Sequence, residues 1–119
     1  MRKIENPVFD NTIYTLNKAY KKSKAHIWRA AIEYLLKSRS RRSVVNVGKI
    51  SRLTKEGDLV LVPGKILGGG IISHKITIGA YSFSEKALWK IQRAGGKTMS
   101  LKDFIEKFPD GKGVILIGG

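Results

Sequence analysis

The chain has 119 residues and no cysteine, so its length suits one domain, and disulfides and thiolate metal sites are excluded. Its charge is unusual, because 23 Lys and Arg residues oppose 9 Asp and Glu residues, for a formal net charge of +14. So large an excess of one sign favours a polyanionic partner, either nucleic acid or an anionic membrane surface. No long apolar run occurs, so we expect a soluble intracellular protein without a signal peptide or transmembrane helix.

The positive charge is concentrated toward the N-terminus. Residues 1–55 hold 14 basic and 3 acidic residues, whereas residues 56–119 hold 9 and 6. This asymmetry predicts that the N-terminal half faces the polyanion. We expect a basic helical extension with a binding loop over residues 1–43 and a globular mixed α/β part over 44–119, within one domain overall.

Apolar residues at helical spacing predict a helix from about Asn11 to Lys22, capped by Asn11 or Thr12. A second helix is predicted from about Ser23 to Lys37, and the sequence leaves open whether the two are one bent helix. Residues 37–43 contain no apolar side chain and are expected to form an exposed loop. A short extended piece at 44–47 and a short helix at 48–53 should follow.

The C-terminal half alternates strands and helices. A strand is predicted over 59–67, where Pro63 indicates an edge or a bulge, and a second strand over 74–81. A capping box at Ser82 should start a helix that ends at Gly95 or Gly96. A second capping signal at Ser100 predicts a short helix, after which residues 114–117 should form a final buried strand.

The segment from Lys37 to Ser43 is the sharpest candidate for a binding site. Its cations alternate with serines, so guanidinium groups and hydroxyls could together contact a nucleic-acid backbone; the alternative is a solvated turn. The cations of this loop are Lys37, Arg39, Arg41 and Arg42. Four upstream residues should extend the same patch, namely Lys21, Lys22, Lys24 and Arg29.

Two glycine-rich segments suggest phosphate contact less strongly. Gly68–Gly70 permits either close approach of a phosphate or a flexible hairpin loop. The segment Gly95–Thr98 ends like a nucleotide-binding loop, but position 91 is Ile91 where that motif needs glycine, so a helix stop is favoured.

No constellation predicts catalysis or a cofactor. His26 and His74 lack clustered carboxylates or cysteines, and the acids are scattered along the chain. We therefore expect no enzyme activity, metal, cofactor or small-molecule substrate. Trp28 and Trp89 occupy helical apolar positions, which favours core packing over base stacking.

Several stretches together resemble one family, the archaeal and eukaryotic large-subunit ribosomal protein numbered eighteen, which is related to the bacterial large-subunit protein numbered fifteen. The similarity lies in IWRAAIEYLLKSRSRRSVVNVGKISRL (27–53), VPGKILGGG (62–70), HKITIGAYSFSEKALWKIQRAGGKTMSL (74–101) and FPDGKGVILIGG (108–119). No single motif is decisive, but the ordered set at this spacing is specific, and its short C-terminal end is similar to that of the archaeal members.

The resemblance implies an irregular strand–strand–helix superhelix, no catalytic activity, and contact of the N-terminal helices and basic loop with ribosomal RNA. The positions that it implies as RNA-facing are Arg29, Lys37, Arg39, Arg41, Arg42, Lys49 and Arg52, together with Lys65 and Lys75. The implied partners are large-subunit ribosomal RNA and neighbouring ribosomal proteins, in the cytoplasm. The alternatives are a basic DNA-compacting protein, a small RNA-processing enzyme and a membrane-surface protein.

Overall fold

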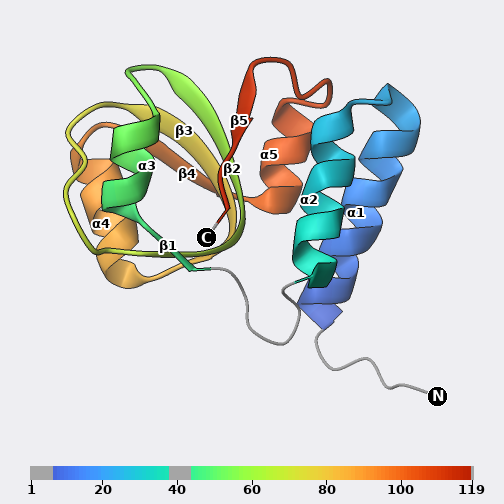
Figure 1. Cartoon of the computed structure of the whole chain (residues 1–119), viewed down its shortest axis with the longest axis horizontal. Coiled ribbons are helices and arrows are strands. Elements are labelled where there is room, and N and C mark those ends of the chain that lie inside the picture. Colours follow the sequence, from blue (N-terminus) through green and yellow to red (C-terminus); the bar gives the residue numbers. More distant parts are fainter. Residues whose placement is uncertain (1–6, 38–43, 119) are drawn as a thin grey trace.

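Within the described residues, five parallel strands form a twisted central sheet, and helices cover both of its faces (Figure 1). The computed structural model describes residues 7–37 and 44–118. The helices are α1 (Pro7–Ser23), α2 (His26–Lys37), α3 (Val47–Leu53), α4 (Glu85–Arg93) and α5 (Leu101–Lys107). The strands are β1 (Val44–Asn46), β2 (Asp58–Leu67), β3 (Ile76–Phe83), β4 (Lys97–Ser100) and β5 (Val114–Leu116). The mixed α/β class predicted from the sequence is confirmed.

Strand β2 organises the sheet. One of its edges pairs with β3, in the register Val60 to Ile78, and β3 pairs in turn with β4. The other edge is shared by two short strands, since β5 pairs with residues 59–61 and β1 with residues 65–67. Pro63 lies between these two partners, where β2 also shifts register between Val62 and Lys65. The sequence predicted that Pro63 lies either at a β-bulge or in an edge strand. The bulge is confirmed by the register shift, and the edge-strand prediction is wrong because β2 has paired strands on both sides.

The connection from β2 to β3 is a crossover. The two strands are parallel, so residues 68–75 must carry the chain back along the length of the sheet. The predicted hairpin alternative for Gly68–Gly70 is therefore wrong. Parallel strands usually need a connection of about a dozen residues or more, which is why so short a segment suggested a hairpin.

Alternation along the strands supplies a separate hydrophobic core on each face of the sheet. Val60 and Val62 join one core, beneath α3 and α4, whereas Leu61 joins the other, beneath α1, α2 and α5. On β3 the predicted apolar face is confirmed, since Ile76, Ile78 and Ala80 are buried in the first core. The fold thus has three layers, with the basic helices α1 and α2 packed on one side.

Helices α1 and α2 are two separate helices. Helix α1 begins at Pro7, so the predicted caps at Asn11 and Thr12 are wrong; proline suits a first helical position because its fixed φ matches the helix and its missing N–H needs no partner there. The chain turns at Lys24, whose φ is +62°, and the Lys24 amide donates to the Tyr20 carbonyl at 2.7 Å. None of the helices in the described parts of the chain is both long and apolar enough to cross a membrane.

The two later helix starts follow hydroxyl caps. The Ser100 Oγ accepts from the Asp103 amide at 3.1 Å, which confirms the predicted cap of α5. The cap of α4 is Ser84, which accepts from the Ala87 amide, and not the predicted Ser82. Ser82 pairs with Lys65 within the sheet, so β3 continues past it before the helix begins.

Candidate nucleic-acid interface

The turn between α1 and α2 holds one group of the predicted RNA-facing residues. Lys21, Lys22 and Lys24 are exposed there, and Arg29 lies in the second turn of α2. Ser23 fixes the turn, because its Oγ donates to the Ala19 carbonyl at 3.0 Å and accepts from the amide of residue 25 at 3.2 Å. We call Lys21, Lys22, Lys24 and Arg29 the turn cluster.

Arg29 is partly engaged within the protein. Its Nε donates to Glu33 Oε2 at 3.3 Å, and both side chains are more than half exposed. A hydrogen bond to Tyr20 and then the one to Glu33 raise the pKa of the Arg29 guanidinium above its usual range. Exposed ion pairs of this kind are weak, and a phosphate could therefore replace Glu33 as the partner of Arg29.

The predicted loop lies at the other end of α2. The side chain of Lys37 and the residues Arg39, Arg41 and Arg42 lie outside the described residues. Lys65 is close to where that loop rejoins the fold, because it pairs with Val44 at the start of β1 and is exposed. Helix α2 has 12 residues, so its two ends are about 18 Å apart. That the turn cluster and the loop form one patch stays a prediction.

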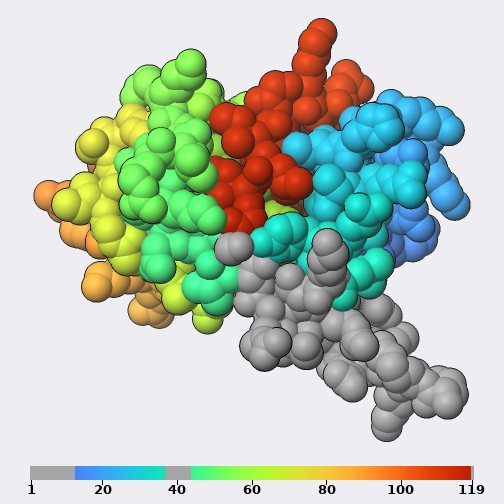
Figure 2. Space-filling view, in the orientation of Figure 1, coloured from blue at the N-terminus to red at the C-terminus, as the bar shows by residue number. Residues whose placement is uncertain are grey.

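Helix α3 positions Lys49 and Arg52 on a third region. In Figure 2 the C-terminal segment lies between α3 and α2 on the visible face. Lys49 is half-buried, and its Nζ donates to the Gly118 carbonyl at 2.8 Å, so this lysine holds the C-terminal segment in place. Arg52 is exposed and is better placed than Lys49 to contact a phosphate.

Lys75 lies at the amino end of β3, immediately before its first residue. Its amide donates to Glu56 Oε1 at 3.2 Å, and its carbonyl accepts from the Gly57 amide at 2.8 Å. A Cβ on Gly95 would lie 3.0 Å from Lys75 Cγ, which places this exposed side chain over the carboxyl end of α4. The predicted residues that the structure describes thus come from α1 and the turn after it, α2, α3, β2 and the residue before β3.

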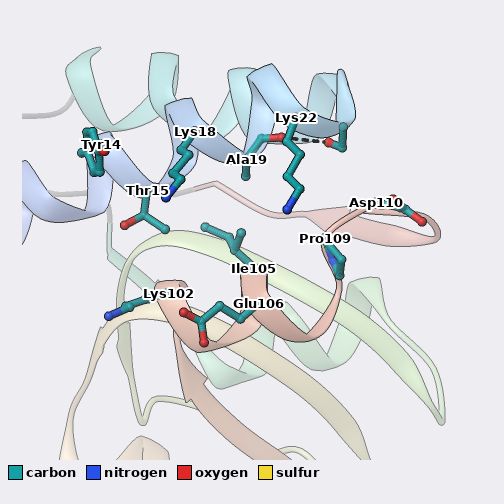
Figure 3. Close-up of a pocket in the computed structure, with 11 residues that line it drawn as sticks. Tyr14, Thr15, Lys18, Ala19, Lys22, Lys102, Ile105, Glu106, Pro109 and Asp110 are labelled. Carbon is teal, nitrogen blue, oxygen red and sulfur yellow. Dashed lines mark hydrogen bonds between the residues drawn. The ribbon is translucent and has the colours of Figure 1, made fainter.

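A groove of about 940 Å³ between α1 and α5 brings Lys22 of the predicted set together with Lys18 and Lys102, two lysines that the sequence analysis missed (Figure 3). Lys18 and Lys22 point from α1 toward α5, where Lys102 also lines the groove. Glu106 and Asp110 line it as well, so the groove carries mixed charge. The spacing of Lys18 and Lys22, one helical turn apart, could have indicated a shared face, whereas only the fold brings Lys102 to them.

The Gly68–Gly70 segment is held in place by hydrogen bonds to β1, α3 and α4, although Gly69 and Gly70 are exposed. The Gly69 amide donates to Asn46 Oδ1, and its carbonyl accepts from the Gly48 amide, each at 2.9 Å. Lys90 Nζ donates to the Gly68 carbonyl at 2.7 Å and also to the Gly70 carbonyl. Gly70 has φ +89°, a conformation that favours glycine. These contacts give the glycines a structural role, while phosphate contact stays a prediction.

The remaining candidate sites have structural explanations. His74 Nε2 lies 2.8 Å from the Thr54 hydroxyl, which ties the crossover to the end of α3. Gly95 has φ +88° and follows the end of α4, which confirms the helix stop and not a nucleotide-binding loop. Within residues 7–37 and 44–118, no group of three or more His, Asp or Glu side chains is placed to hold a metal ion.

The two tryptophans differ in environment. Trp28 is fully buried in the second core, as predicted, and its Nε1 donates to the Pro109 carbonyl at 2.9 Å. Trp89 is 57% exposed, so its predicted core position is wrong. Helix α4 buries Ala87 and Ile91, which lie one turn apart, and Trp89 falls outside that stripe.

Known proteins resemble this chain over most of its length. The model of a family of ribosomal proteins, described as 50S-L15, 50S-L18e and a 60S counterpart, matches residues 30–99. A protein of Pyrobaculum aerophilum named large ribosomal subunit protein eL18 is 43% identical over 102 residues, which cover 86% of this chain and 84% of that protein. Proteins of the same name are 40% identical in Archaeoglobus fulgidus over 117 residues and 38% identical in Methanococcus maripaludis over 119 residues. Each of these two alignments covers 98% of this chain and 99% of the relative.

Proposed function

Because this chain belongs to the family of ribosomal proteins that includes 50S-L15 and 50S-L18e, we propose that it is a structural constituent of the large ribosomal subunit that binds ribosomal RNA through its basic N-terminal half. It works in the cytoplasm, on the ribosome, beside neighbouring ribosomal proteins. The family is one of structural ribosomal proteins and not of enzymes, and we propose no catalytic role. The observation that carries RNA binding is the net charge of +14, which gathers toward the N-terminus.

The mechanism is electrostatic positioning at several separate points. The turn cluster lies where α1 ends and α2 begins, and α2 is fixed by Trp28, Ala31 and Leu35 in the second core. Packing of this helix fixes the positions of the cluster's cations, which lets the protein select RNA segments whose phosphates lie at the matching separation. We propose that the chain divides into an N-terminal extension over residues 1–43 and a globular part over residues 44–119. Most of the RNA-binding residues precede this boundary.

Fluorescence-anisotropy titrations with large-subunit ribosomal RNA fragments over a range of salt concentrations test this proposal. The double variant Lys21→Ala/Lys22→Ala should reduce the salt slope of log K by roughly 2, since each lost phosphate contact removes about 1. The matched control is Lys55→Ala/Lys86→Ala, which removes two exposed lysines outside the predicted set and should leave the slope unchanged.

Two outcomes would overturn the proposal. One is an equal loss of slope in both double variants, which would mean that net charge alone drives binding. The other is equal affinity for ribosomal RNA and duplex DNA at the same salt concentration, which would favour the DNA-compacting alternative.

A further inference from the structure

An exposed apolar surface lies at the carboxyl end of α4, away from the turn cluster. Trp89 is 57% exposed and Ile71 is 77% exposed, and both line a cavity of about 400 Å³. That volume is within the range of about 300–1,000 Å³ found for small-ligand sites. Large apolar side chains that gather on a surface indicate a partner that covers them.

The chemistry around the cavity identifies the partner class. The Arg93 guanidinium lies over the Trp89 ring, with its Cζ 4.9 Å from the ring centroid. Lys90 and the Ser73 hydroxyl also belong to the lining, and no carboxylate is among the described residues that line it. The α1–α5 groove, in contrast, is lined by Glu106 and Asp110. An aromatic face beside a guanidinium and without an acid suits an anionic ligand with a flat ring.

Lys75 extends this positive surface. Its side chain lies against Gly95. Gly95 directly follows Ala94, which is the last residue along the chain to line the cavity. Lys75 therefore lies beside the carboxyl end of the helix that carries Trp89. Glu56 is the nearby acid, but its Oε1 already accepts from the Lys75 amide.

We propose that Trp89 and Arg93 form a platform on which an unpaired base of RNA stacks, with Lys75 available to its phosphate. Stacking requires a base freed from its helix, and aromatic and guanidinium planes are the usual platforms in proteins that bind single-stranded RNA. This inference rests on the proposed function in one respect, because it takes RNA as the partner. The site itself is separate, because Trp89, Arg93 and Lys75 lie outside the N-terminal half.

The test uses the whole protein and two probes, a short labelled oligoadenylate and a fully paired RNA duplex. Trp89→Ala should weaken oligoadenylate binding roughly 5- to 150-fold, as expected for loss of one stacked base. Trp89→Phe keeps an aromatic face and should retain most of the affinity. Tyr14→Ala is the matched control, because it removes a 66% exposed aromatic side chain from α1. Thermal melting checks that each variant is folded.

Intrinsic fluorescence gives a second measurement. Oligoadenylate should quench the exposed indole of the wild-type protein, and Trp89→Phe should abolish that quenching, because the remaining Trp28 is buried. The duplex should not quench either protein. The proposal is overturned if Trp89→Ala binds oligoadenylate as the wild type does, if Tyr14→Ala loses as much affinity, or if saturating oligoadenylate leaves the fluorescence unchanged. The N-terminal proposal is independent of these outcomes, since Trp89→Ala should still show the full salt slope on ribosomal RNA.

Discussion

Lys24 affects both the stability of the α1–α2 pair and its positive charge. Replacing Lys24 with glycine should raise the free energy of unfolding while removing one cation. Its φ of +62° is in the left-handed region, where a side chain costs about 1–2 kcal/mol. Glycine avoids that cost but loses more backbone entropy on folding, by roughly 0.5–1 kcal/mol. The expected net gain for Lys24→Gly is therefore about 0.5–1 kcal/mol, because the Lys24 amide keeps its bond to Tyr20.

Thermal denaturation followed by circular dichroism measures this change. For a chain of this size, about 0.5–1 kcal/mol corresponds to a rise in Tm of roughly 2–6 °C. Lys24→Ala is the control, since it removes the same charge but keeps a Cβ in the left-handed conformation. Both variants should lose affinity for ribosomal RNA to the same extent, while only the glycine variant gains stability. If Lys24→Gly melts at or below the temperature of Lys24→Ala, the strain argument is refuted.

Three further changes test other parts of the account. Glu33→Gln should raise RNA affinity up to a few-fold in anisotropy titrations, because it frees Arg29 from its exposed pair; lower affinity would contradict the view that Glu33 competes with phosphate. Trp28→Phe should lower the free energy of unfolding in urea by about 1–3 kcal/mol, through loss of the bond to Pro109 and of buried volume; an unchanged midpoint would refute the anchoring role of that bond. Gly79→Ala should destabilise the fold by about 1–3 kcal/mol, since its Cβ would lie 2.5 Å from a side-chain carbon of α5; a neutral urea midpoint would show that α5 is not tightly packed there.

Local signals in the sequence predicted many individual elements. The alternation of Ile76 and Ile78 indicated which face of β3 is buried, and Ser100 indicated the start of α5. These predictions succeed because side-chain period and hydroxyl capping act within a few residues. The start of α4 was misplaced because Ser82 and Ser84 both precede a plausible helix, and only pairing across the sheet assigns Ser82 to β3.

The arrangement of the elements depended on contacts distant in sequence. A short glycine-rich connection suits a hairpin, yet Lys90, Asn46 and Gly48 hold Gly68–Gly70 in a crossover. Those partners come from three different elements, so no local pattern could reveal them.

The candidate site was predicted as a set of residue types and not as an arrangement. Charge counts identified the N-terminal half, but only the fold shows that Lys18, Lys22 and Lys102 line one groove. Trp28 and Trp89 both occur at helical spacing from other apolar residues, so the sequence predicted that both are buried. Helix α4 buries Ala87 and Ile91, and Trp89 lies outside this buried face and is exposed. The second RNA surface proposed for α4 was therefore hidden from the sequence.

The most direct test of the ribosomal role is sedimentation of the endogenous protein from cell lysate through sucrose gradients, at low salt and after a high-salt wash. We expect the protein to migrate with the large subunit and to remain there after the wash, because several separated contacts must be released together. A protein found only at the top of the gradient would exclude a stable place in the large subunit.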